Sequence, residues 1–345
     1  MPVNPESPAW LRVFCEIKYV RTVINELTYL PLLVKEVARA DVVHVFSASY
    51  ASYLLAPLPA MLIGRALGKP VILNYRSGEA PDHFNRSAIA RKTIARVDRN
   101  IVPSQFLVDV FASFGIDAGI IPNIVDLDRF SFRERVPIRP RIVSTRNFDD
   151  LYNVACTIRA FRLVQDRRPD ATLTLVGGGA QEGELRALAA RLGVSHIEFA
   201  GRVSPDQIAE YYAANDIYVQ TPNIDNMPTS ILEAFASGLP VVSTEAGGVP
   251  AILTHGEHGL LAPLDDHEQV AAHILRLLDD QAYANRLARA GLARVQSCTW
   301  SNVREQWLHA YRGVLPELST TGDTGAAENA NKNNPVSSVS SVVES

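Results

Sequence analysis

The sequence predicts an α/β protein made of two domains, each a doubly wound parallel sheet of the Rossmann type. Short apolar runs rich in β-branched residues alternate with helical segments along most of the chain. The alternation stops at residues 132–140 (FRERVPIRP), a charged stretch with two prolines that is typical of a linker, and then restarts. The length of 345 residues suits two domains of roughly 100–200 residues each.

The first domain is expected to span residues 1–136. Its apolar runs predict strands at 42–46, 71–75, 100–102 and 120–122, and its helical patterns fall at 20–39, 51–67, 88–97 and 104–114. Strand, helix and strand at this spacing form βαβ units, which pair in parallel. No clear strand precedes the helical pattern at 20–39.

The second domain is expected to span residues 137–297. Strands are predicted at 142–145, 172–176, 197–200, 217–220, 241–243 and 260–262, with helices at 154–167, 182–192, 206–214, 230–236 and 268–278. Residues 298–318 are expected to form a final helix, and the polar segment 319–345 lacks the apolar residues needed to order it. Two such sheets leave a cleft at the carboxyl ends of their strands, where ligands bind.

Composition and charge exclude several classes of function. Lys+Arg total 33 against Asp+Glu 37, so the net charge of −4 disfavours a nucleic-acid partner. The three cysteines have no metal-ligand or disulfide spacing, which suits a reducing cytoplasm. No histidine pair has the spacing of a zinc site, so no metal site is expected. The amino-terminal residues do not resemble a signal peptide, and the apolar stretch 54–64 is too short to span a bilayer.

A glycine-rich turn follows the strand predicted at 172–176. Gly177, Gly178 and Gly179 would let backbone amides approach a phosphate at the start of a helix. The next glycine is Gly183, so the dinucleotide fingerprint GxGxxG is absent. A tight turn between strand and helix explains the three glycines equally well.

Two carboxylates flank a loop-to-helix junction in the segment 225–234 (DNMPTSILEA). Asp225 precedes the helix and Glu233 lies one turn inside it. The amides between them suit a diphosphate, and the carboxylates suit sugar hydroxyls. The alternative is a capping box formed by Ser230 and Glu233, which would have only a structural role.

Arg146 follows the first strand of the second domain. An arginine at the carboxyl end of a parallel strand points into the cleft, where it can hold a phosphate. An ordinary surface arginine is the other interpretation.

These segments together resemble the family 4 (group 1) retaining glycosyltransferases, which have the GT-B fold. The resemblance covers about residues 41–311 and rests on eight segments in order: DVVHVFSAS (41–49), GKPVIL (68–73), IPNIVDLDRF (121–130), LTLVGGG (173–179), FAGRVSPDQIAEYYAANDIYV (199–219), DNMPTSILEAFASGLPVVST (225–244), GGVPAIL (247–253) and HGLLAP (258–263). The closing segment 300–311 matches the family's helix that crosses back to the first domain.

The resemblance implies roles on the donor side. Asp225 and Glu233 match the family's pair of acids, with the first acid one methylene shorter, and Arg146 matches its phosphate-binding arginine. The lysine that usually accompanies this arginine aligns with Tyr152, so one positive charge is missing. Asp225, Glu233 and Arg146 are the expected catalytic groups. The expected donor-binding residues are Gly178, Asn226, Met227, Pro228, Thr229, Ser230, Ile231 and Tyr152.

Departures from the family pattern concern the acceptor side. Arg76 stands where the family has a histidine, and Glu79 and His83 follow it as further acceptor-side candidates. The sequence is also expected to lack the family's opening strand and its glycine-rich loop.

The resemblance implies a retaining glycosyltransferase that needs no metal or other cofactor. Its donor would be a UDP-, GDP- or ADP-sugar, and its acceptor the hydroxyl of a carbohydrate, a lipid-linked molecule or a small molecule. A cytoplasmic location is expected, with peripheral contact at the inner face of the membrane left open, as is the oligomeric state. Two alternatives stand beside it: a non-catalytic nucleotide-sugar-binding or scaffold protein, and another GT-B enzyme such as an epimerase.

Overall fold

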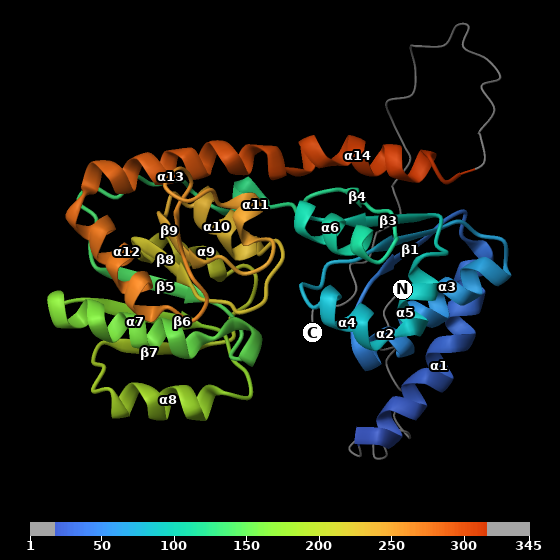
Figure 1. The fold of residues 1–345 in the computed structure, drawn as a ribbon, viewed down its shortest axis with the longest axis horizontal. Coiled ribbons are helices and arrows are strands. Elements are labelled where there is room, and N and C mark those ends of the chain that lie inside the picture. Colours follow the sequence, from blue (N-terminus) through green and yellow to red (C-terminus); the bar gives the residue numbers. More distant parts are fainter. Residues whose placement is uncertain (1–17, 316–345) are drawn as a thin grey trace, which may run out of the picture.

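The computed structural model describes residues 18–315, with side chains from residue 28 onward, and shows two α/β lobes (Figure 1). Each lobe contains one sheet in which every strand pairs in parallel. The α/β class and the two parallel sheets expected from the sequence are therefore confirmed. The expected disordered segment 319–345 lies outside the described residues.

The first sheet contains four strands that run across it in chain order. They are β1 (Val43–Phe46), β2 (Val71–Asn74), β3 (Arg99–Val102) and β4 (Gly119–Ile120). Its helices are α1 (Lys18–Arg39), α2 (Tyr50–Leu55), α3 (Pro57–Ala66), α4 (Ala80–Arg86), α5 (Ala88–Ile94) and α6 (Gln105–Ser113). Within residues 18–315, β1 is the edge of this sheet, and the part of the chain before α1 lies outside the description.

One helix expected in the first lobe is wrong. The pattern at 51–67 is divided into α2 and α3, which meet at Ala56. The backbone of Ala56 is not helical, with φ −122° and ψ −61°, and Pro57 is the first residue of α3. A proline has no amide hydrogen to donate to the preceding turn, so it favours a new helix start at this point.

The second sheet contains six strands in the order β10-β9-β8-β5-β6-β7. They are β5 (Arg141–Thr145), β6 (Thr172–Val176), β7 (Ile197–Gly201), β8 (Ile217–Gln220), β9 (Val241–Thr244) and β10 (Leu260–Ala262). The chain first adds strands on one side of β5 and then returns to add the others on its opposite side. The point where this order reverses, between β5 and β8, is where doubly wound sheets bind ligands.

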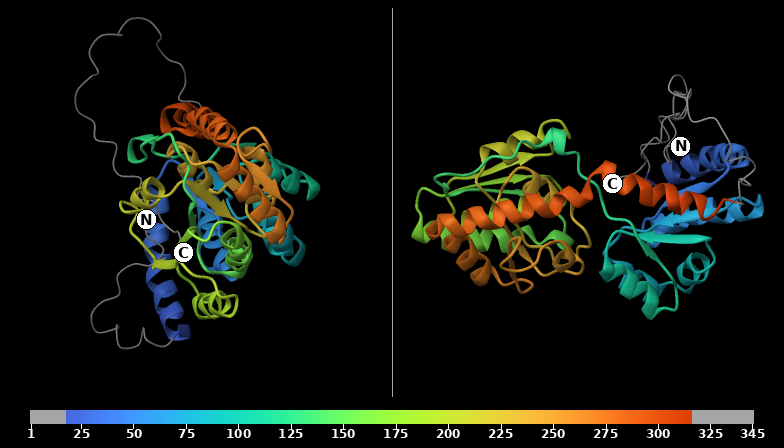
Figure 2. Two further views of the ribbon diagram at one scale, coloured as in Figure 1. Left: turned by 90° about the vertical axis from the view of Figure 1, so that its left-hand side faces the viewer. Right: turned by 90° about the horizontal axis from the view of Figure 1, so that it is seen from above.

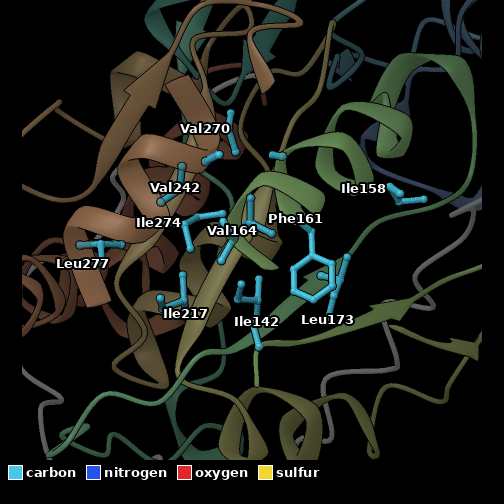
Figure 3. Packing of buried hydrophobic residues seen from close by; sticks show 14 of the residues in the cluster. Ile142, Ile158, Phe161, Val164, Leu173, Ile217, Val242, Val270, Ile274 and Leu277 are labelled. Carbon is cyan, nitrogen blue, oxygen red and sulfur yellow. The ribbon is translucent and has the colours of Figure 1, made fainter. Parts of the chain in front are cut away.

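Helices cover both faces of the second sheet. They are α7 (Val154–Arg167), α8 (Glu182–Arg191), α9 (Ile208–Ala214), α10 (Thr229–Ala236), α11 (Val249–Ile252), α12 (His267–Asp279) and α13 (Gln281–Val295). Successive residues of β5 point to opposite faces. Ile142 packs with Phe161 of α7 and Ile274 of α12 (Figure 3), whereas Val143 packs with Phe235 of α10.

A long helical segment joins the two lobes. After α13, the chain continues into α14 (Trp300–Arg312), and the two helices run along the same side of the molecule over both lobes (Figures 1 and 2). Val303 and Ala310 of α14 pack against Ile72 and Ile101 of the first sheet. The crossing back expected for residues 300–311 is thus present, whereas α13 was not expected from the sequence.

His44 of β1 lies beneath α14. Its Nδ1 is 2.6 Å from the Tyr311 hydroxyl, and its ring lies 4.8 Å from that of Trp307. Its Nε2 is buried without a hydrogen-bond partner in the described part of the chain. Burial and the nearby Arg76 lower the pKa of His44 from 6.5 to about 4. The folded protein therefore holds this ring neutral at neutral pH.

The neutral state of His44 predicts a loss of stability in mild acid. Between pH 6.5 and about 4, the unfolded chain binds a proton at this residue that the folded chain does not bind. The free energy of unfolding should therefore fall as the pH falls through this range. Urea unfolding at several pH values should show a smaller fall for His44→Gln than for the unaltered chain. The same substitution at the exposed His309 of α14 is the control, and equal slopes for both variants would contradict the prediction.

The charged linker at 132–140 is fastened to the second lobe. Asp216, fully buried before β8, accepts hydrogen bonds from Arg133 at 2.9 Å and from the backbone and side chain of Arg139, each at 2.8 Å. Arg135 is 1% exposed and donates to the carbonyl oxygens of Tyr212 and Asn215. The linker is thus an ordered segment whose three arginines surround one carboxylate.

None of the helices in residues 18–315 combines the length and the apolar character needed to cross a bilayer.

Candidate functional site

Loops that follow strands of both sheets meet beside the reversal point of the second sheet. Gly78 follows β2 in the first lobe, and Asp225 follows β8 in the second. A Cβ atom built on Gly78 would lie 3.0 Å from the carbonyl carbon of Asp225 and 3.1 Å from the side chain of Ile224. The absence of a side chain at Gly78 therefore lets the two backbones approach closely.

Arg146 follows β5 at this point and is 10% exposed. Its Nη2 donates to Oδ2 of Asp225 at 2.5 Å, and its Nη1 donates to Oγ of Ser230 at 3.1 Å. Burial alone would lower the pKa of Arg146, but the interactions with Asp225 and with the side chains of Tyr218, Tyr152 and Tyr212 together more than offset it, and the pKa is raised. Its Nε is buried with no partner among the described residues. The site thus contains a charged arginine whose Nε–H has no acceptor among the described residues.

Asp225 uses both carboxylate oxygens within the protein. Oδ2 accepts from Arg146, and Oδ1 accepts from the amide of Asn226 at 2.8 Å. Its carbonyl oxygen accepts from the amide of Gly248 at 3.2 Å, and a Cβ atom on Gly247 would lie 2.2 Å from that oxygen. An ionised carboxylate has about four acceptor positions, so the group keeps the capacity to bind a further donor.

Tyr152 ends the short 3-10 turn Asp150–Tyr152 and stacks on the arginine. The Cζ atom of Arg146 lies 4.0 Å from the centroid of its ring. Burial raises the pKa of Tyr152, so the ring is neutral at neutral pH. A cation–π contact therefore orients the Arg146 guanidinium, and the position expected for lysine contributes no charge.

The helix α10 begins at Thr229 with Pro228 as its N-cap. Its first turn contains no acidic residue, so its positive end is not neutralised locally. The amide of Ile231 donates to the carbonyl of Pro228 at 3.2 Å. The amide of Ile231, one of those expected to face the diphosphate, therefore takes part in the first turn of the helix. Thr229 and Ser230 remain at the head of the helix, beside Arg146.

Glu233 does not form a capping box. The N-cap of α10 is Pro228, which makes no side-chain cap, and the hydroxyl of Ser230 donates to Gln220 at 3.1 Å. Oε2 of Glu233 instead accepts from the hydroxyl of Tyr212 at 2.8 Å. That hydroxyl also lies 2.7 Å from Oγ1 of Thr145, at the end of β5. The network holds the carboxylate of Glu233 beside the carboxyl end of the strand that carries Arg146.

The three glycines after β6 have different surroundings. A Cβ atom on Gly177 would lie 2.1 Å from the carbonyl oxygen of Arg146, and one on Gly179 would lie 2.5 Å from that of Phe148. A tight approach between two backbones explains both. Gly178 differs, because the nearest atoms to its Cβ position belong to the side chain of Arg202.

Asn226 and Met227 connect the loop to the first lobe. The hydroxyl of Ser104, after β3, donates to Oδ1 of Asn226, and Nδ2 of Asn123 donates to the carbonyl of Met227 at 2.6 Å. The two residues are 2% and 5% exposed. The structure thus places these two expected donor-binding side chains between the lobes, where they position Asp225.

The three expected acceptor-side residues have different surroundings. Arg76 is exposed, and its Nε donates to Oδ1 of Asn123 at 3.0 Å. Glu79 is the N-cap of α4, and its charge contributes to the raised pKa of Tyr152 across the lobes. His83 is 1% exposed, and its Nδ1 is 3.0 Å from the Tyr75 hydroxyl. The expected acceptor role of His83 is therefore wrong, because its ring is enclosed in the core of the first lobe.

Sequence reasoning missed several residues that shape the site. Ser104 and Asn123 are polar residues in the loops that follow β3 and β4, a position that could have identified them. Tyr212 carries no such signal, because an aromatic residue in a helix usually indicates core packing. No group of three His, Cys, Asp or Glu residues is arranged to hold a metal ion within the described part of the chain.

Two family models match the chain in succession. The model described as Glycosyltransferase Family 4 matches residues 9–129, and the model described as Glycosyl transferases group 1 matches residues 129–294. The second match contains Arg146, Asp225 and Glu233.

Curated relatives support the same family. The chain is 32% identical to the phosphatidyl-myo-inositol mannosyltransferase of Mycobacterium tuberculosis over 213 residues, which cover 59% of this chain and 56% of the relative. It is 23% identical to the sulfoquinovosyl transferase of Arabidopsis thaliana over 312 residues, which cover 82% of this chain and 59% of the relative. The chain thus spans little more than half the length of each relative.

Solved structures show the same fold. HepE of Anabaena in complex with UDP and glucose superposes with a TM-score of 0.72 at 20% identity, covering 82% of this chain and 81% of that one. Sucrose-phosphate synthase of Thermosynechococcus elongatus superposes with a TM-score of 0.67 at 21% identity, covering 83% and 78%. The GT-B fold is therefore confirmed, and the chain belongs to the group 1 glycosyltransferases of family 4.

Proposed function

We propose that the protein is a retaining glycosyltransferase that transfers a sugar from a nucleoside diphosphate sugar to a hydroxyl without a metal ion. The observation that carries the proposal is the buried guanidinium of Arg146 at the reversal point of the second sheet, with its Nε unpaired among the described residues. The head of α10 lies beside it, and the carboxylate of Glu233 is linked through the Tyr212 hydroxyl to Thr145, the residue before Arg146. A diphosphate and a sugar require this combination of donors and acceptors.

The chemistry of the proposed reaction depends on stabilising the leaving group. Negative charge grows on the diphosphate as the bond to the sugar breaks, and Arg146 and the positive end of α10 are already oriented toward it. Asp225 and Glu233 accept hydrogen bonds from sugar or ribose hydroxyls. As the family resemblance implies, the acceptor hydroxyl attacks from the face that the diphosphate leaves, so the configuration at the anomeric carbon is retained.

The names of the relatives support classes of substrate. One relative is named as a mannosyltransferase acting on phosphatidyl-myo-inositol, and HepE was solved with UDP and with UDP-glucose. We therefore propose a UDP-, GDP- or ADP-hexose donor and a carbohydrate, lipid-linked or small-molecule acceptor, handled in the cytoplasm or at the inner face of the membrane.

A thermal-shift panel with UDP, GDP, ADP and their sugar conjugates tests donor binding. A ligand at 100 times its dissociation constant stabilises the folded state by about 2.7 kcal/mol. A shift with one nucleotide and its conjugates would support the proposal and identify the base, and transfer would then be assayed with that donor. Binding without transfer to any acceptor would favour the scaffold alternative, and no shift with any nucleotide would contradict a donor site.

Replacing Glu233 with glutamine should weaken donor binding and transfer. The substitution keeps the size of the side chain but removes its charge, and a charged hydrogen bond is about twice as strong as a neutral one. We expect the dissociation constant of the donor, measured by calorimetry, to rise about tenfold. Glu210→Gln, at an exposed position on α9, is the matched control. Equal affinities of the two variants would return Glu233 to a structural role.

A further inference from the structure

The positive charge of the proposed donor site is largely balanced within the protein. The charge of Arg146 is paired with Asp225 at 2.5 Å, and Glu233 adds a second carboxylate nearby. Tyr152 is neutral where a lysine was expected. A diphosphate carries more than one negative charge, so a further cation near this edge of the sheet would strengthen its binding.

Arg202 lies at the same edge as Arg146. It directly follows β7, and the strand order places β5 and β7 on opposite sides of β6. The carboxyl ends of three neighbouring strands therefore carry Arg146, the glycines 177–179 and Arg202 side by side. In parallel strands these ends meet at one edge, which is where ligands bind.

The local backbone turns Arg202 toward the glycines. The pairing of β6 with β7 shifts register after Leu175, so that Val176 pairs with Gly201, and Gly201 has a φ of +75°. Such irregularities redirect the side chain that follows. A Cβ atom on Gly178 would lie 3.2 Å from Cγ and 3.4 Å from Nε of Arg202. The aliphatic part of the Arg202 side chain therefore covers Gly178, the only glycine of the three at 177–179 whose Cβ position is not crowded by another backbone segment.

The charge of Arg202 has no internal partner in the described structure. Its side chain is exposed, and none of the hydrogen bonds or ion pairs among the described residues involves it. Neighbouring arginines differ in this respect, since Arg186 pairs with Glu182 at 2.8 Å and Arg146 pairs with Asp225. An unpaired guanidinium attracts a phosphate more strongly than one that must first leave a carboxylate.

We propose that Arg202 binds the phosphates of the donor's nucleoside diphosphate, supplying the second cation that position 152 lacks. The proposal rests on the proposed function, since it assigns a further binding residue to the same site. It makes Arg146 and Arg202 two cations on either side of the glycine turn. Their contributions should be partly additive, because they extend from different strands.

The test measures the affinity of Arg202→Gln for UDP, GDP, ADP and inorganic pyrophosphate by calorimetry. Arg191→Gln, at the exposed end of α8, removes the same charge from the same lobe and is the control. For Arg202→Gln we expect about a tenfold loss of affinity both for the nucleotide that binds the unaltered chain and for pyrophosphate, with a larger loss at low salt. Arg202→Lys should recover part of the affinity, because it restores the charge without the planar fork.

Other outcomes would overturn the proposal. A loss for the nucleotide but none for pyrophosphate would mean that Arg202 contacts the base or ribose. Equal affinities of Arg202→Gln and the control would mean that it contacts neither. If the unaltered chain bound no nucleotide and no pyrophosphate, both the proposed function and this inference would fail. If the unaltered chain bound nucleotide and Arg202→Gln bound it equally well, only this inference would fail.

Discussion

Replacing Arg146 with glutamine is expected to weaken the binding of nucleoside diphosphates about 10- to 100-fold. The estimate follows from roughly 1.5–3 kcal/mol for hydrogen bonds to charged groups. The Arg146 side chain is 10% exposed, so solvent screens its charge little, and its Nε has no hydrogen-bond partner among the described residues. Calorimetric titration with the nucleotide that binds the unaltered chain measures the change.

The control for this prediction must separate charge from folding. Arg159→Gln removes an arginine of α7 that is 40% exposed and whose nearest carboxylate, Asp265, is 3.9 Å away. It should leave nucleotide affinity unchanged. Arg146→Gln also leaves Asp225 without its partner, so the free energy of unfolding is measured in parallel. A folded Arg146 variant with unaltered affinity would remove this residue from the donor site.

Asp216→Asn is expected to lower the free energy of unfolding by about 3–5 kcal/mol, the usual effect of removing one partner from a buried ion pair. Asp216 is fully buried, and it is the carboxylate between Arg133, Arg135 and Arg139 of the linker. Asparagine retains the shape but leaves three guanidinium groups without their counter-charge. Urea unfolding checks the change, with Asp166→Asn, a half-exposed residue paired within α7, as the control.

The free energies of unfolding of the unaltered chain and of Asp216→Asn are expected to become similar in acid. Burial alone would raise the pKa of Asp216, but the hydrogen bonds from Arg139 and Arg133 more than offset it and hold the pKa below its ordinary value. The ionised carboxylate of Asp216 therefore contributes to the free energy of unfolding at neutral pH. This contribution is lost only as the pH falls below about 3.9 and through the lowered pKa. The difference in stability between the unaltered chain and Asp216→Asn should persist to pH 5 and shrink below pH 4. A constant difference would contradict this.

Local patterns in the sequence were sufficient for most elements of the fold. Runs such as 142–145 and 172–176 are rich in aliphatic and β-branched residues, and the structure places there strands whose buried residues fall on both faces. The helices α4, α11 and α13 were missed. α4 has only seven residues and α11 only four, and α13 contains six alanine and glycine residues, which blur an apolar stripe.

The residues of the candidate site that directly follow strands could be predicted from the sequence. Arg146 and the segment around Asp225 follow β5 and β8, and their place in the order of elements marked them as cleft residues. His83 failed because a histidine two residues beyond a proline carries no local sign of burial. Its enclosure by Tyr53, Tyr75 and Phe84 depends on three elements that meet only in the folded lobe.

The sequence by itself determined the two α/β lobes, the linker between them and the family, because alternation of strands and helices is a local property and the motifs occur in order. Only the tertiary structure decided that Arg146 is paired with Asp225, 79 positions away, and that Glu233 is held by Tyr212 rather than by its helix cap. It also placed Arg202 beside Gly178. Such pairings depend on the order of strands in the sheet, which no local pattern encodes.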